Sequence, residues 1–221
     1  MSFFEFISTY WPRLLSGTGI TVAQFFLSAF FAVILSLIFG LMKLSPNRLV
    51  KGFAVTYIEI FRGTSLLVQL YWIFFVLPLF GVTLEKFTAG YVAIAMNTGA
   101  YGAELVRGGI LSVPKGQWEA ATAINMSPAK RMWRIILPQA LVNMLPPWGN
   151  LMIEVLKGTA LVSLISVTDL MFEAKQINSS TFLSAQIFGT ALIIYYILAR
   201  FLLTPFMRWL EAYMSRKMGR A

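Results

Sequence analysis

The sequence predicts an all-α membrane protein. Of its 221 residues, 58% are hydrophobic and 12% are charged, and the mean hydropathy is +0.73. An ordinary soluble domain has about 25% charged residues. The apolar residues form five long runs, and most Lys and Arg residues lie in the gaps between these runs. Both features are typical of membrane-spanning helices joined by short loops.

The five apolar runs are the predicted spans, because a spanning helix needs roughly 20 mostly apolar residues. Together they predict a single transmembrane domain. The spans are placed at residues 18–42, 53–80, 88–111, 141–156 and 187–207.

The basic residues predict the orientation of these spans. Most of them lie between the first two spans, between the third and fourth, and after the fifth. The other side of the membrane has only Arg13, Lys86, Lys157 and Lys175. Because short cytoplasmic loops are enriched in Lys and Arg, the N-terminus is expected outside and the C-terminus in the cytoplasm. The net charge of +9 is interpreted in the same way, so we expect contact with the lipid bilayer and none with nucleic acid.

Two absences limit the chemistry of the chain. It has no Cys and no His, which excludes disulfides, thiolate or imidazole metal sites, and Ser-His or Cys-His catalytic pairs. It also has no G-x-x-x-x-G-K-[ST] motif for ATP hydrolysis. We therefore expect no catalytic residues, no metal and no cofactor in this chain.

Residues 115–138 form a polar and basic island between the third and fourth predicted spans, called the elbow below. A short helix is predicted to open at Gly116 and Gln117. Asn125 falls where this helix should end, because Asn tolerates the left-handed conformation of a helix C-cap. The helix presents little side-chain bulk to another protein at Ala120, Ala121 and Ala123.

A second helix is predicted to begin at once. Ser127 is a suitable N-cap and Pro128 a suitable first residue, and Pro138 is expected to mark a further break. Apolar residues of this helix would pack inward, whereas Lys130, Arg131 and Arg134 would stay solvated. Two capped helices in so few residues predict a rigid docking element on the cytoplasmic side.

The order Glu119-Ala120-Ala121, turn, Ile136-Leu137-Pro138 resembles the EAA loop of permease subunits of bacterial ABC importers, the binding-protein-dependent transport system inner-membrane components. In that family the loop forms coupling helices that sit in a cleft of a cytoplasmic ATPase. The family usually has Gly where this chain has Asn125. On this resemblance we assign ATPase coupling to Gln117, Glu119, Ala120, Ala121, Asn125 and Arg131.

Three further runs, at 57–64, 100–110 and 137–147, look like polar amino-acid permeases of the histidine/glutamine/arginine/opine group. This resemblance implies a MetI-like five-helix core in the bacterial inner membrane, paired with a second permease as a homo- or heterodimer. It also implies a cytoplasmic ABC ATPase dimer, which uses ATP and Mg, and an extracytoplasmic binding protein. Residues 157–160 read Lys-Gly-Thr-Ala where the family commonly has Lys-Asp-Thr-Ser, which keeps opine-type and ectoine-type solutes open as substrates.

Polar residues inside the predicted spans are candidates for a substrate pathway, because ionisable groups in a membrane are costly and usually functional. Asn97, Tyr101 and Glu104 share one helix face at i, i+4 and i+7. Glu154 and Lys157 are spaced i, i+3 on the fourth span.

A structural role is the alternative for these polar residues. Glu104 would then form an ion pair with Arg107, one turn away. A structural ion pair between Glu59 and Arg62 is expected from the same spacing on the second span.

The segment 158–186 is long for a simple loop, so we predict an external or re-entrant helix within it. Thr168 is the expected N-cap of this helix, with Asp169 in its first turn.

The leading functional prediction is a permease subunit that moves a polar amino acid or a related compatible solute. One alternative is an ion-coupled secondary transporter, which predicts internal repeats and acidic residues at the midplane of the bilayer. Another is an intramembrane enzyme, which would need a carboxylate pair or a Ser-Lys arrangement in place of His and Cys.

Overall fold

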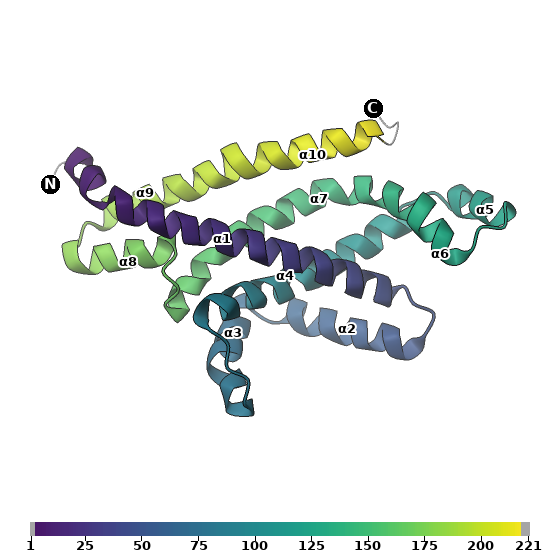
Figure 1. The fold of residues 1–221 in the computed structure, drawn as a ribbon, viewed down its shortest axis with the longest axis horizontal. Coiled ribbons are helices and arrows are strands. Elements are labelled where there is room, and N and C mark those ends of the chain that lie inside the picture. Colours follow the sequence, from purple (N-terminus) through teal and green to yellow (C-terminus); the bar gives the residue numbers. More distant parts are fainter. Residues whose placement is uncertain (1–2, 218–221) are drawn as a thin grey trace.

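The computed structural model describes residues 3–217, which form helices and no strand, as predicted. The long helix α1 (Phe3–Lys43) runs along most of the molecule, with the α9–α10 rod on one side and α2 and α3 on the other (Figure 1). The turns η1, η3 and η5 are π-helical, and η2 and η4 are 3₁₀. The remaining elements are α2 (Arg48–Gly63), α3 (Leu66–Tyr71), η1 (Trp72–Val76), η2 (Leu77–Phe80), α4 (Lys86–Leu111), α5 (Lys115–Ala123), α6 (Pro128–Arg131), η3 (Met132–Ile136), α7 (Leu137–Gly158), η4 (Thr159–Ile165), α8 (Leu170–Thr181), α9 (Ser184–Ile197), η5 (Leu198–Leu203) and α10 (Thr204–Lys217).

Small residues bring α1 and α4 into close contact. A Cβ atom built on Gly40 of α1 would lie 2.7 Å from Val106 Cβ, and one built on Gly99 of α4 would lie 2.8 Å from Leu35 Cβ. Such close approach of two helix backbones is typical of membrane proteins, in which van der Waals packing drives helix association. One fully buried face of α1 consists of Thr21, Gln24, Ser28, Ala32 and Ser36.

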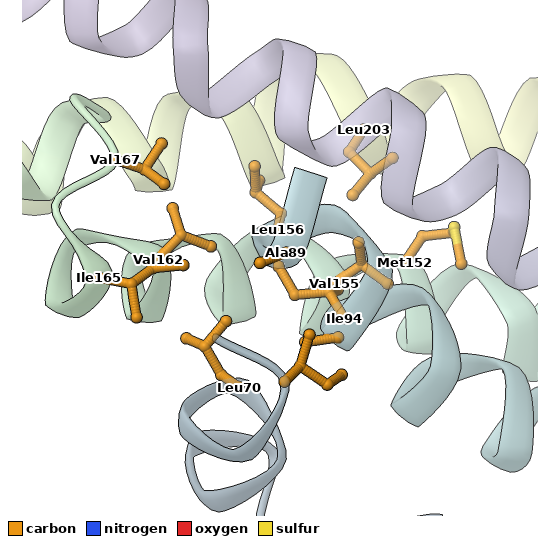
Figure 2. Close-up of a cluster of buried hydrophobic side chains, with 12 residues drawn as sticks. Leu70, Ala89, Ile94, Met152, Val155, Leu156, Val162, Ile165, Val167 and Leu203 are labelled. Carbon is orange, nitrogen blue, oxygen red and sulfur yellow. The ribbon is translucent and has the colours of Figure 1, made fainter. Parts of the chain in front are cut away.

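A hydrophobic cluster joins the other helices to this pair. Figure 2 shows its side chains converging from α3, α4, α7, the turns η4 and η5, and the loop before α8. Its labelled members are Leu70, Ala89, Ile94, Met152, Val155, Leu156, Val162, Ile165, Val167 and Leu203.

The second predicted span, 53–80, is not one continuous helix. α2 begins earlier, at Arg48, where the Asn47 side chain accepts a hydrogen bond from the Leu49 amide at 2.9 Å. After Gly63 the chain bends by 106° into α3 and the turns that follow it. The bend leaves backbone carbonyls at the end of α2 without helical partners. One of them is satisfied by a side chain, because Gln69 Nε2 donates to the Phe61 carbonyl at 2.9 Å.

Within residues 3–217, three helical runs are long and apolar enough to cross a membrane on their own: Glu5–Lys43, Pro128–Ile165 and Ser184–Arg216. The bent pair α2 and α3–η2 would be a fourth, broken span. The range predicted for the fourth span, 141–156, is the middle of the run that begins in the elbow. The third predicted span corresponds to α4, which is not among these runs. α4 is largely buried by the other helices, and many of its residues are Gly or Ala, which allow close packing.

The two ends of the molecule differ. The elbow elements α5 and α6, the turn between α1 and α2, and the C-terminal end of α10 lie at one end (Figure 1). α8 and the N-terminal end of α1 lie at the other (Figure 1).

The helix predicted within 158–186 is α8, but its N-cap is Asp169 and not Thr168. Asp169 Oδ1 accepts the amide hydrogen bond of Phe172 at 2.9 Å, and the Asp169 side chain is fully buried. The helix is tied to α1 twice: Thr21 Oγ1 accepts from the Leu170 amide at 3.1 Å, and Arg13 pairs with Glu173 at 2.7 Å. Burial raises the pKa of Asp169 from 3.8 to about 6.

This raised pKa predicts a pH dependence of stability. Because folded Asp169 holds its proton more tightly than the unfolded chain does, its contribution to stability increases as the pH falls from 7 towards 4. Asp169→Asn keeps the helix cap but does not titrate. We therefore expect this variant to lose the pH-dependent part of the stability that Asp169 contributes. The measurement is thermal unfolding of both proteins across that pH range; equal pH slopes would contradict the assignment.

Candidate functional site

The first half of the elbow folds as predicted. Asn125 has a φ of 55°, so it takes the left-handed conformation that ends α5. The Met126 amide donates to the Ala121 carbonyl at 3.1 Å, and the Asn125 amide to the Thr122 carbonyl at 2.9 Å. These two bonds are those of a Schellman motif, which satisfies the last carbonyls of a helix.

The second half begins as predicted and continues further. Ser127 is the N-cap of α6 and its hydroxyl accepts from the Lys130 amide, while Pro128 is the first helical residue. Pro138, however, does not end the helix. The π-turn η3 lies just before it, and the wider turn accommodates the proline ring, which would otherwise clash with the carbonyl of Arg134. The elbow is thereby continuous with α7.

Three residues assigned to ATPase coupling serve the elbow itself. Arg131 is not solvated as predicted: its Nη1 donates to Thr122 Oγ1 at 2.5 Å, and its guanidinium carbon lies 5.5 Å from the centroid of the Trp118 ring. Ala121 is 3% exposed, so it is not available to another protein. Gln117 accepts a hydrogen bond from Gln139 of α7 at 3.2 Å, which fastens the two helices together.

The outward surface of the elbow is both polar and apolar. Of the six assigned coupling residues, four are exposed: Gln117, Glu119, Ala120 and Asn125. Sequence reasoning missed Ile124 and Trp133, which are 73% and 66% exposed. Both are large apolar residues within a polar island, and this contrast could have marked them in the sequence as candidate contact residues. The exposed basic residues of the elbow are Lys115, Lys130 and Arg134.

Glu104 lies in a cluster of cations. Its predicted partner Arg107 is 3.7 Å away, but Arg62 of α2 is also within 3.8 Å and Lys43 of α1 pairs with the same carboxylate. The predicted pair of Glu59 with Arg62 is wrong: Arg62 turns towards Glu104, and no ion pair of Glu59 occurs in the described part of the chain. Glu104 therefore connects three helices.

Asn97 and Tyr101, the other two members of the predicted stripe, also hold α2. Asn97 Nδ2 donates to the Phe61 carbonyl and to Gln69 Oε1, each at 3.0 Å. The Tyr101 hydroxyl donates to the Arg62 carbonyl at 3.4 Å. These side chains therefore form hydrogen bonds with backbone carbonyls at the bend after α2. The sequence signal for this bend that was missed is Gln69, a polar amide within an apolar run.

Glu154 and Lys157 lie elsewhere, on an exposed side of α7. They form an ion pair at 2.8 Å and their side chains are 66% and 64% exposed. Asn150, one turn earlier, is exposed on the same side and was not predicted. We call Asn150, Glu154 and Lys157 the polar face. A charged pair is too costly to leave against lipid, so this face must meet protein or water.

No three His, Cys, Asp or Glu side chains within residues 3–217 are grouped as metal ligands. The elbow instead exposes Glu119, Lys130 and Arg134, and the polar face exposes Asn150, Glu154 and Lys157.

The fold defines the class: a helical membrane protein with a compact helical elbow at one end. The family model for binding-protein-dependent transport system inner membrane components matches residues 14–216. The chain belongs to this family and is a permease subunit of an ABC importer.

Similar proteins include amino-acid permeases. A probable amino-acid ABC transporter permease of Sinorhizobium fredii is 46% identical over 92% of this chain and 87% of its own length. The L-cystine transport system permease of Bacillus subtilis is 42% identical over 77% and 73%. The nopaline transport system permease of Agrobacterium fabrum is 34% identical over 94% and 92%.

Two solved structures resemble the fold. The crystal structure of an amino acid ABC transporter with histidines has a TM-score of 0.88 and 37% identity, and the match covers 96% of this chain and 99% of that chain. An inward-facing methionine ABC transporter has a TM-score of 0.81 at 20% identity, over 93% and 98% of the two chains, and shares the fold alone. The predicted MetI-like fold is confirmed.

The left-handed turn at Asn125 is testable. Glycine takes this conformation without strain, so Asn125→Gly should preserve the elbow, whereas Asn125→Val should destabilise it by about 1–2 kcal/mol. The measurement is the rate of protease cleavage at the elbow in the detergent-solubilised protein. Cleavage at the wild-type rate in the valine variant would contradict the assignment.

The cation cluster predicts a stability effect of Glu104→Gln. Removing its carboxylate leaves three cations close together, at a cost of about 2 kcal/mol or a decrease in Tm of about 4–8 °C. The matched control is Glu59→Gln, which removes an exposed carboxylate and should leave the Tm within about 2 °C. A purely pathway role for Glu104 would instead change substrate preference at constant Tm.

Proposed function

We propose that this permease subunit moves a polar amino acid or a related compatible solute into the bacterial cell. An extracytoplasmic binding protein would deliver the solute, and a separate cytoplasmic ATPase dimer, using ATP and Mg, would energise its transport. The chain itself would not be catalytic. The observation that carries this proposal is the elbow: two capped helices locked by a left-handed turn at Asn125 and by Arg131 across the corner.

The ATPase would dock on the outward surface of the elbow. Glu119 and Ala120 are exposed in the elbow, as are the apolar Ile124 and Trp133. An apolar centre with charges at its rim is the usual composition of a protein interface. Ala121, Asn125 and Arg131 would contribute indirectly, because they hold the shape of the elbow. The positive-inside rule supports a cytoplasmic elbow and C-terminus, with the N-terminus outside.

The polar face of α7 would line the solute pathway, opposite a second permease that is either another copy of this chain or a related one. Glu154 and Lys157 offer one charge of each sign, which suits the carboxylate and ammonium groups of an amino acid. Asn97, Tyr101 and Glu104 would support this pathway indirectly, since they contact other helices of the same chain. The relatives named for cystine and nopaline transport support an amino-acid or opine substrate; an ectoine-type solute stays a proposal from the sequence alone.

Reversing the charge of Glu119 should impair docking. We expect Glu119→Lys to lower binding-protein-dependent uptake about tenfold, which corresponds to ~1.4 kcal/mol of interface energy, with unchanged protein levels in the membrane. The control is Glu85→Lys, an exposed charge reversal before α4 and outside the elbow. Normal uptake by Glu119→Lys in reconstituted vesicles would contradict the coupling role.

Neutralising Glu154 should change selectivity and leave stability nearly unchanged. Exposed ion pairs contribute at most about 1 kcal/mol, so Glu154→Gln should keep the Tm within about 3 °C. Its uptake of cationic amino acids should decrease relative to neutral ones in a competition assay. An unchanged ratio would remove Glu154 from the pathway.

A further inference from the structure

An apolar groove lies between α1, α7 and the rod formed by α9, η5 and α10. Its volume is about 630 Å³, within the range of cavities that bind small organic molecules. The two long helices that form its sides are α1 and the α9–α10 rod in Figure 1. Every residue that lines it has an apolar side chain, including Phe26, Ala29, Phe30, Met152, Leu202 and Phe206.

The groove lies on the opposite side of α7 from the polar face. Trp148 and Met152 line the groove, whereas Asn150 and Glu154 each follow one of them by two residues. A step of two residues is about 200° around an α-helix, so the two sets point in opposite directions. The charged side of α7 must meet protein or water, whereas the apolar lining of the groove is a surface that lipid chains can cover without cost.

Aromatic rings lead from the groove to a positive charge. Phe206 lines the groove and stacks on Trp209, with ring centroids 6.1 Å apart; Trp209 stacks on Tyr213 at 5.7 Å. Arg216 follows Tyr213 by three residues, continues the same face of α10 and is exposed. Trp and Tyr are enriched at the level of lipid headgroups, and Arg binds phosphate groups.

We propose that this groove binds an anionic phospholipid from the leaflet at which α10 ends. One acyl chain lies between α1 and α10, the glycerol region contacts Trp209 and Tyr213, and the phosphate pairs with Arg216. The choice of occupant rests on this charge complementarity and on the apolar lining. It also rests on the proposed function, in which a second permease covers Glu154 and Lys157 at the polar face; among the residues that line the groove, only Trp148 has a hydrogen-bonding group.

The test uses the full chain, purified from membranes together with its partner subunits. Native mass spectrometry counts the phospholipid that it retains after titration with phosphatidylglycerol or with phosphatidylcholine of the same acyl chains. Three variants are compared: Arg216→Gln, Ala29→Phe, which fills the groove, and the control Arg208→Gln. Arg208 is an exposed cation of the same helix that lies off the aromatic face.

The wild type should retain phosphatidylglycerol in preference to phosphatidylcholine. Arg216→Gln should lower this preference about fivefold, the factor that one cation near an anionic membrane surface contributes. Ala29→Phe should lose the retained lipid of either kind, and Arg208→Gln should resemble the wild type. Retention is measured without transport, so the result is independent of ATPase coupling.

Three results would overturn the proposal. The wild type would show no preference between the two lipids, the two arginine variants would lose the preference equally, or a cysteine placed at Leu202 would form a disulfide-linked dimer of this chain in the membrane. The first two would leave only ordinary bilayer contact, and the third would make the groove a permease interface.

Discussion

The close approach of α1 and α4 is the contact on which the other helices depend. In a bilayer, burial of apolar surface gives little net drive for two helices to associate, so packing and interhelical hydrogen bonds must supply it. Here Ser36 Oγ of α1 donates to the Gly99 carbonyl at 3.1 Å, and Gln24 Nε2 to the Phe87 carbonyl at 2.9 Å. A larger side chain at Gly40 or Gly99 would have to displace these backbones.

The other helices are placed by this pair. α2 packs through Tyr57, whose ring stacks on Phe39 at 3.8 Å and whose hydroxyl donates to the Met96 carbonyl at 2.6 Å. α4 then leads into the elbow, where Trp118 and Ile136 pack on the cluster that contains Val106. Residues near both ends of the elbow therefore pack against the core. The elbow thus joins α4 to α7, and these two helices also pack on each other.

Local chemistry made the elbow predictable. A left-handed Asn, an N-capping Ser and a Pro at the first helical position act within a few residues, so Asn125, Ser127 and Pro128 could be placed from the sequence. The helical class and the permease family were predictable as well, from composition and from the motifs around Glu119 and Glu104.

Long-range contacts were the part that could not be predicted. Arg131 was expected in water because a helix wheel does not show that α6 folds back onto Trp118. Glu104 has partners 61 and 42 residues away in sequence, at Lys43 and Arg62, which spacing on one helix cannot indicate. The bend after Gly63 depends on Gln69 and Asn97, which reach its carbonyls only in the folded chain.

Cysteine cross-linking in native membranes tests the coupling role of the elbow most directly, because the chain has no cysteine of its own. Ile124→Cys should form a cross-link to the cytoplasmic ATPase, since this side chain is 73% exposed on the outer surface. Ala121→Cys, which is buried, should not, and neither should Phe182→Cys after α8, at the opposite end of the molecule (Figure 1). A cross-link from Phe182→Cys to the ATPase, or none from Ile124→Cys in an assembled complex, would contradict the account.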